Sequence, residues 1–251
     1  MLLEPLRVDP RAPLARANPL AKLGAAAIAM LVLFFSVDPL TPALMLAAIA
    51  CAVGLSGIPA RALLRRTWPV LFAAIGASAI NGVFGSGGPS LTAATATGLR
   101  LVAIALAGVV AFITIDPTDL ADSLMQHLHA PPRFAVGALA AFRLLPIFAA
   151  EWETIRLARR ARGIDDRSSW LRRVASFRAR SFALLVAAIR RGVRLALAMD
   201  ARGFDTMTCR SVARPQPFTG LDRALVLGAL VLALGIVVLG TVLGTWRPLL
   251  R

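Results

Sequence analysis

Two copies of an Ala-Arg-Gly tripeptide are the residues whose types and spacing predict specific binding chemistry. The stretch LARRARGIDD, Leu157–Asp166, returns forty positions later as LAMDARGFDT, Leu197–Thr206. In both copies a Leu-Ala pair begins four residues before the alanine of the tripeptide, and an apolar residue and an aspartate follow the glycine. An arginine guanidinium is a planar fork that can hold a carboxylate through two hydrogen bonds at once. The repeat therefore predicts two similar binding tips for acidic groups.

The glycine of each copy indicates that these tips are helix ends. Gly163 and Gly203 each follow a helical pattern of residues, and the position just after a helix adopts left-handed geometry most cheaply without a Cβ. A capping glycine accounts for the glycine, but not for the alanine, arginine and aspartate that recur with it. The trailing Asp165 and Asp205 either cap the turn or balance neighbouring arginines, and both roles stay open.

The other two residues of the tripeptide give each tip its expected function. Ala161 and Ala201 keep the last turn narrow, so that it can enter a groove on a partner. Arg162 and Arg202 then project from the tip toward a carboxylate of that partner. Two such tips on one chain imply a partner with two equivalent grooves, most simply a dimer, and joint engagement raises the overall affinity.

The composition places these tips on a membrane protein. Hydrophobic residues make up 58% of the 251 positions, above the roughly 45–50% found in soluble domains. Apolar stretches recur along the whole chain, unlike a secretory leader with one short apolar core, so no cleaved leader is expected. Spans of roughly 20 residues suffice to cross the hydrocarbon. Five are predicted, at residues 20–37, 40–57, 68–84, 97–115 and 225–243.

The basic residues indicate which side of the membrane each segment faces. The net charge is +15, and fifteen arginines against four acids lie between Arg156 and Arg214. Such an excess marks cytoplasmic segments, and RALLRR at Arg61–Arg66 marks the same side after the second span. The prediction is a multi-pass protein with a cytoplasmic N-terminus. The basic block is also compatible with a docking surface for an acidic partner.

Long cytoplasmic helices are expected between the fourth span and the last. They are predicted over residues 118–129, 134–162, 168–180 and 181–202. Apolar positions from Phe182 to Leu197 keep helical spacing. On the opposite side Arg180, Arg191 and Arg202 recur every eleven residues, close to three turns of about 3.6 residues each, and form a basic stripe.

These predictions describe an all-α integral membrane protein with about five transmembrane helices. The expected division has three parts. Residues 1–115 carry the N-terminal transmembrane helices, and residues 116–220 form a cytoplasmic helical module with both Ala-Arg-Gly motifs. Residues 221–251 form the C-terminal transmembrane helix and tail.

Catalytic residues, cofactors and metal ligands are not expected. The only lysine, Lys22, is not part of a G-x-x-x-x-G-K loop, so no nucleotide site is predicted. His127 and His129 are two positions apart on a helix, on different faces, and lack a third ligand at metal spacing. Cys51 and Cys209 give neither a disulfide framework nor a metal pattern. The chain is therefore not expected to be an enzyme.

Two other function classes compete with a docking protein. Nucleic-acid binding is disfavoured because aromatic residues that stack bases are sparse in the basic block, and the chain has no Tyr. A stand-alone secondary transporter or channel with a basic cytoplasmic loop remains the alternative. Such proteins usually place ionisable groups mid-membrane, whereas Asp38, Asp116 and Asp222 approach the spans only at their ends.

Further motifs complete a resemblance to a known family. NPLAKL, Asn18–Leu23, is similar to an N-terminal Asp-Pro-Arg-x-Lys-Leu pattern, from which it departs at Asn18 and Leu20. APPRF precedes a run into the first Ala-Arg-Gly that keeps Arg143, Pro146, Glu151 and Ala158. With the paired signatures, these segments resemble the transmembrane T component of energy-coupling factor (ECF) transporters over essentially the whole chain.

The resemblance implies a coupling function. Each Ala-Arg-Gly tip would dock on one of two ATP-binding cassette ATPase subunits, and the ATPases would hydrolyse ATP. The apolar helices near the tips, the coupling helices, would hold a small membrane-embedded substrate-binding (S) subunit. ATP-driven closure of the ATPase pair would move these helices and drive uptake of a vitamin or transition-metal ion across the bacterial plasma membrane.

Overall fold

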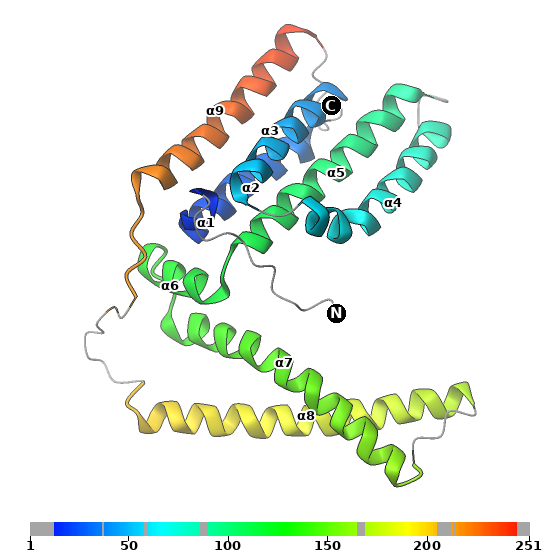
Figure 1. The fold of residues 1–251 in the computed structure, drawn as a ribbon, viewed down its shortest axis with the longest axis vertical. Coiled ribbons are helices and arrows are strands. Elements are labelled where there is room, and N and C mark those ends of the chain that lie inside the picture. Colours follow the sequence, from blue (N-terminus) through cyan, green and yellow to red (C-terminus); the bar gives the residue numbers. More distant parts are fainter. Residues whose placement is uncertain are drawn as a thin grey trace. The chain divides into compact units, whose positions relative to one another are not determined.

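The chain folds into helices that group into two compact units. A computed structural model describes residues 13–36, 38–57, 60–85, 90–164, 169–204, 212 and 214–244. Within these ranges the regular structure is helical, which confirms the all-α prediction. Unit 1 comprises residues 1–130 and 216–251, and unit 2 comprises residues 131–215. Figure 1 shows the helices of both units.

Unit 1 is a bundle of roughly aligned helices with two short ones beside it (Figure 1). Its long helices pack in the spatial order α4, α5, α2 with α3, and α9, so that segments from both ends of the chain lie together. The helices are α1 (Pro13–Arg16), α2 (Pro19–Phe35), α3 (Leu40–Ser56), α4 (Ala60–Phe84), α5 (Leu91–Thr114), α6 (Pro117–His127) and α9 (Gly220–Val242).

Helix length and composition in the structure give candidate membrane spans that differ in part from the five predicted from the sequence. In the described part of the chain, four helices are long and apolar enough to cross a membrane, at 63–84, 91–114, 132–161 and 220–242. The first two predicted spans correspond to α2 and α3, which have 17 residues each. At about 1.5 Å per residue they measure about 25 Å, slightly less than the roughly 30 Å hydrocarbon layer. The candidate span at 132–161 overlaps the helix predicted over residues 134–162, which the sequence assigned to the cytoplasmic module.

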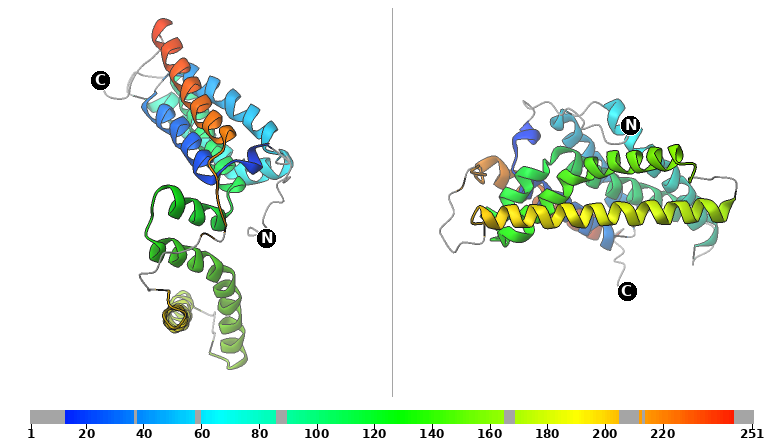
Figure 2. Two further views of the ribbon diagram at one scale, coloured as in Figure 1. Left: turned by 90° about the vertical axis from the view of Figure 1, so that its left-hand side faces the viewer. Right: turned by 90° about the horizontal axis from the view of Figure 1, so that it is seen from below.

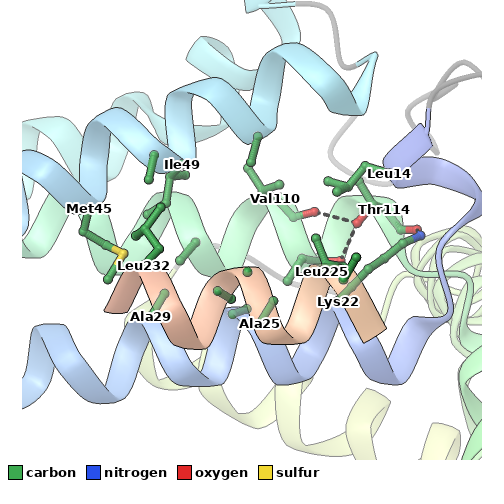
Figure 3. A pocket seen from close by; sticks show the side chains of 18 residues that line it. Leu14, Lys22, Ala25, Ala29, Met45, Ile49, Val110, Thr114, Leu225 and Leu232 are labelled. Carbon is green, nitrogen blue, oxygen red and sulfur yellow. Dashed lines mark hydrogen bonds between the residues drawn. The ribbon is translucent and has the colours of Figure 1, made fainter. Parts of the chain in front are cut away.

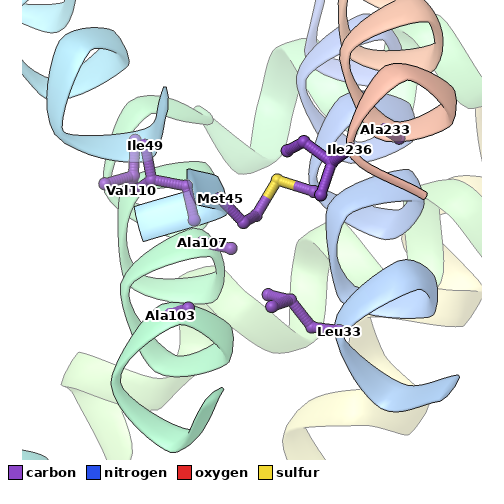
Figure 4. Packing of buried hydrophobic residues seen from close by; sticks show 8 residues of the cluster. All are labelled: Leu33, Met45, Ile49, Ala103, Ala107, Val110, Ala233 and Ile236. Atoms are coloured by element: carbon purple, nitrogen blue, oxygen red, sulfur yellow. The ribbon is translucent and has the colours of Figure 1, made fainter. Parts of the chain in front are cut away.

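The core of unit 1 lies where α2, α3, α5 and α9 meet. Its fully or nearly buried apolar side chains come from all four helices (Figure 4). They are Leu33, Met45, Ile49, Ala103, Ala107, Val110, Ala233 and Ile236. Burial of this cluster explains why α9, from the end of the chain, packs beside the N-terminal helices.

Glycine allows a close approach of two helices in unit 1, but not at two of the glycines of α9. A Cβ at Gly228 or Gly235 would meet nothing within 4 Å, and Gly244 lies beyond the end of α9 with a φ of 67°. The tight approach is between α4 and α5, where a Cβ at Gly82 would lie 2.8 Å from the Cβ of Ala94.

Unit 2 is a pair of long helices, α7 (Pro132–Ala161) and α8 (Trp170–Ala201). The chain runs out along α7 and returns along α8, so the C-terminal ends of the two helices lie at opposite ends of the pair (Figures 1 and 2). The prediction of separate helices over 168–180 and 181–202 is wrong, because α8 is continuous through this junction. Ser181 resembles a helix-capping residue, but no glycine or proline interrupts the helical pattern there.

Aromatic and charged side chains hold α7 and α8 together. The rings of Trp152 and Phe177 make an edge-to-face contact with centroids 5.5 Å apart. The guanidinium of Arg180 lies 5.2 Å from the centre of the Trp152 ring, which places a cation over an aromatic face. Arg191 lies over the ring of Phe148 and forms an ion pair with Glu151, with N and O atoms 3.0 Å apart. Two arginines of the α8 stripe, Arg180 and Arg191, therefore contact α7 inside unit 2.

Candidate docking site

The first Ala-Arg-Gly copy ends α7 in a Schellman motif. Arg162 is the C-cap residue, and Gly163 has a φ of 70°. The amide of Gly163 donates to the carbonyl of Arg160 at 2.9 Å, and the amide of Ile164 donates to that of Arg159 at 3.1 Å. These bonds satisfy carbonyls that a helix end leaves open. The left-handed glycine predicted from the sequence is confirmed.

The second copy ends α8 in the same way. Arg202 is the C-cap residue, and Gly203 has a φ of 74°. The amide of Gly203 donates to the carbonyl of Asp200 at 2.9 Å, and the amide of Phe204 donates to that of Met199 at 3.0 Å. The two copies therefore build one local structure twice.

Both arginine tips are exposed. Ala161, Arg162, Ala201 and Arg202 are all exposed in the structure. Within the described part of the chain, the side chains of Arg162 and Arg202 form no hydrogen bond or ion pair. A guanidinium that is free of internal partners can bind a carboxylate on another molecule. The two aspartates that follow the tips, Asp165 and Asp205, lie outside the described residues.

Left-handed glycines also follow two other helices, so the glycine alone does not distinguish the ends of α7 and α8 from other helix ends. Gly57 and Gly244 have φ values of 67° each at the ends of α3 and α9. Neither is preceded by Ala-Arg. Helix capping thus explains a glycine at all four ends, whereas the alanine and arginine are specific to the ends of α7 and α8.

The apolar face of α8 is exposed. Its large side chains at helical spacing are between 53% and 69% exposed. The apolar face is defined here by Phe182, Leu185, Ile189, Val193 and Leu197. Because Arg180 and Arg191 contact α7 from the other side of the helix, this face points away from the packed seam. Exposed apolar surface of this kind marks an interaction site.

A buried polar cluster lies at one end of unit 1. The carboxylate of Asp222, which is 1% exposed, accepts hydrogen bonds from the amide of Asn18 at 2.6 Å and from the amide and hydroxyl of Thr219 at 2.7 Å each. Lys22, 6% exposed, donates to the carbonyl of Thr114 at 2.9 Å. The start of α2, the end of α5 and the start of α9 are thereby brought to the same end of the bundle.

Gln216 joins this cluster to α6. Its backbone amide donates to Oε1 of Gln126 at 2.9 Å, and its side-chain amide donates to Oδ1 of Asp119 at 3.0 Å. Its carbonyl lies 2.7 Å from Nε2 of His127. His127 is therefore part of a structural contact. In the described residues, no three His, Cys, Asp or Glu side chains are grouped to hold a metal ion.

Sequence reasoning missed the role of this cluster. It identified Asn18 and Lys22 only as parts of a motif, and Asp222 only as an acid near a span. A usable signal was present, because Thr219 and Asp222 have the spacing of a capping box, which the structure shows at the start of α9. The partners of Asp222 and Lys22 are 204 and 92 positions away, and no local pattern predicts such distant pairs.

Comparisons with known proteins identify the family of this chain. The profile of the CbiQ family, described as cobalt transport protein, matches residues 10–211. The energy-coupling factor transporter transmembrane protein EcfT of Limosilactobacillus fermentum is 32% identical over 211 residues, which cover 76% of this chain and 79% of that protein. EcfT of Listeria innocua is 27% identical over 210 residues, 75% of this chain and 79% of the relative.

A third relative matches over a shorter length. EcfT of Bacillus subtilis is 29% identical over 143 residues, 54% of each chain. The family profile nevertheless spans both Ala-Arg-Gly copies and most of the described helices. The chain therefore belongs to the CbiQ family of ECF transporter T components, a family of multi-pass membrane proteins.

Proposed function

We propose that this chain couples two ATPase subunits to a substrate-binding membrane subunit in an ECF-type importer. The observation that carries the proposal is the pair of equivalent helix ends, each with an exposed arginine that has no partner among the described residues. Each tip would seat in a groove on one ATPase and pair with a carboxylate there. Family membership favours this role over a stand-alone transporter or channel.

The distance between the two tips supports two separate binding grooves on the partner rather than one. The helix α8 has 32 residues, and at about 1.5 Å per residue it is about 48 Å long. The ends of α7 and α8 lie at opposite ends of the pair (Figure 1). Two tips spaced on this scale suit two copies of one protein, such as an ATPase dimer, better than a single groove.

The packing within unit 2 supports its use as a lever. The contacts of Trp152, Arg180 and Arg191 join α7 to α8 as one body. Closure of the ATPases on ATP would shift both tips, and a stiff helix pair would carry that shift to whatever is bound to it. ATP hydrolysis would take place in the partner subunits, and this chain would transmit the resulting motion. It would lie in the bacterial plasma membrane with its N-terminus in the cytoplasm.

The apolar face of α8 is the proposed contact with the S subunit. Among the described helices, α8 is not one of those apolar enough to cross a membrane, yet this face is mostly exposed. A membrane-embedded partner with its own apolar surface would cover it. The cargo, a vitamin or a transition-metal ion, would be selected by that subunit.

Copurification of the ATPases with the tagged chain tests the docking role. If each arginine pairs with a buried carboxylate, Arg162→Glu and Arg202→Glu should each weaken docking by about 2–5 kcal/mol. The double variant should lose the ATPases, whereas each single variant retains part of the binding because the other tip stays engaged. Arg194→Glu is the matched control, since it makes the same charge change at an exposed position of α8. Full ATPase recovery with the double variant would refute the docking role.

A further inference from the structure

An apolar cavity of about 310 Å³ lies inside unit 1, among α2, α3, α5 and α9 (Figure 3). Of the 18 described residues that line it, only Lys22 and Thr114 are polar, and both lie at one end. Met45, Ile49 and Leu232 lie at the other end (Figure 3). Much of the remaining wall consists of alanine, so the space is left by small side chains.

The cavity offers water too few partners. The ammonium of Lys22 donates to the carbonyl of Thr114 at 2.9 Å. The hydroxyl of Thr114 is used within α5, where it donates to Val110 at 2.9 Å and lies 3.1 Å from the carbonyl of Ala111. A buried water needs about two to four polar partners. The rest of the wall supplies none, so the cavity is suited to an apolar occupant.

The size of the cavity selects among apolar occupants. An engineered apolar cavity of about 150 Å³ stays dry and binds benzene, and this one is about twice that volume. An α-helix is about 10 Å across, whereas a stretch of a single hydrocarbon chain is much thinner. A stretch of one such chain therefore suits a cavity of this class better than a partner helix does.

The surroundings supply such a chain. The helices α5 and α9 are apolar enough to cross a membrane, so lipid tails are the solvent around them. Three wall residues on α9, Ala224, Gly228 and Leu232, are exposed, so the cavity opens to the surface of unit 1 along this helix. A tail can enter from that side without crossing a polar barrier.

We propose that the cavity binds one acyl chain of a membrane phospholipid. The glycerol end lies toward Lys22 and the buried polar cluster, and the methyl end lies toward Met45 and Leu232. The chain fills the space that the alanines leave between α9 and the N-terminal helices. This inference is independent of ATPase docking, because it concerns only unit 1.

Two glycines of α9 provide a matched pair of variants. Gly228 lines the cavity and Gly235 does not. A Cβ at either position would meet nothing within 4 Å, and both lie inside the same helix. Gly228→Leu should therefore fill the cavity, while Gly235→Leu makes the same chemical change outside it. Both changes remove a helix-interior glycine, so their effects on helix propensity match.

The test is photolabelling in vesicles of palmitoyl-oleoyl phosphatidylcholine. The vesicles contain a small fraction of a phosphatidylcholine with a diazirine near the end of one acyl chain, and the full-length chain is reconstituted with its copurifying partners. Labelled peptides are mapped by mass spectrometry. Labelling of the wall near Met45 and Ile49 is expected in the wild type and in Gly235→Leu, with at least a fivefold loss in Gly228→Leu. Labelling of exposed Phe72 and Ile75 on α4 should be equal in all three.

Two results would overturn the proposal. One is equal labelling of the wall in the wild type and Gly228→Leu, which would mean that the tail does not occupy this space. The other is a wall that stays unlabelled in the wild type while α4 is labelled, which would mean that the cavity closes or holds a protein segment. If Gly228→Leu does not fold, Ala229→Leu, from the same wall, replaces it. ATPase copurification is scored on the same samples and should be unchanged, which separates this test from that of docking.

Discussion

Single residues set the shape and charge of the two proposed docking tips. Gly163 and Gly203 take left-handed geometry, and the capping bonds that follow fix the last turn of each helix. The arginine before each glycine is then held at the C-cap with its side chain exposed. The glycine therefore fixes the backbone of each tip and the neighbouring arginine supplies its charge. Substitutions of the two residues test these contributions separately.

The left-handed turn predicts opposite effects for two glycine-to-alanine changes. A Cβ at Gly163 would meet nothing within 4 Å, so Gly163→Ala costs only left-handed strain, about 1 kcal/mol. That cost should raise hydrogen exchange at the amides of residues 163 and 164 about fivefold. Gly192→Ala, in the interior of α8, should instead slow local exchange, because alanine favours a helix by about 0.8–1 kcal/mol. Equal effects of the two changes would contradict the assigned geometry.

The buried carboxylate predicts a large stability effect at Asp222. Asp222→Ala leaves the buried amide of Asn18 without its acceptor, which costs about 1–3 kcal/mol. It also removes the capping box of α9, at about 1 kcal/mol. The melting temperature in detergent should fall clearly. Asp116→Ala is the control, since Asp116 is an exposed N-cap of α6 whose loss costs about 1 kcal/mol. An equal fall of the melting temperature in both variants would contradict a stabilising role of the buried cluster.

At the scale of elements, α8 has two chemically different faces. Arg180 and Arg191 contact aromatic rings of α7, while the apolar face of α8 is exposed. An amphipathic helix in a soluble protein usually buries its apolar side. Here the charged side makes the internal contact, which is the arrangement expected of a helix whose apolar side is covered by a partner.

This arrangement predicts that polar changes on the apolar face spare folding. Leu185 and Ile189 are 56% and 58% exposed, so Leu185→Asp with Ile189→Asp should alter stability by less than about 1 kcal/mol. Copurification of the membrane-embedded partner should be lost while the ATPases remain. Ala183→Asp, on the arginine side and also exposed, is the control that should retain both. Retention of the membrane partner by the double variant would count against this surface.

At the scale of the whole molecule, the buried polar cluster holds the starts of α2 and α9 at the same end of unit 1. Asn18 bonds to Asp222, and Lys22 bonds to Thr114. The starts of α2 and α9 and the end of α5 therefore face the same side, as the predicted alternation of spans requires. We propose that this side is the cytoplasmic one and that the chain divides into three parts at residues 115 and 220.

Cysteine labelling in intact cells tests the orientation. In a background with Cys51→Ala and Cys209→Ala, Arg16→Cys and Arg162→Cys should react with a membrane-impermeant maleimide only after the cells are opened. Leu91→Cys, at the opposite end of α5 and 83% exposed, should react in intact cells. The positive-inside rule is the reason for this expectation. Labelling of Arg162→Cys from outside would invert the topology and remove the docking proposal.

The sequence alone determined the features that depend on local patterns. Apolar runs and the repeated Ala-Arg-Gly identified the helical membrane class and both left-handed glycines, because each of these depends on neighbours within one or two turns. Only the tertiary structure decided the features that depend on distant pairs. The buried cluster around Asp222, the apolar cavity and the inward position of the α8 arginines all arise from contacts between different helices, and local periodicity carries no information about which faces of two helices meet.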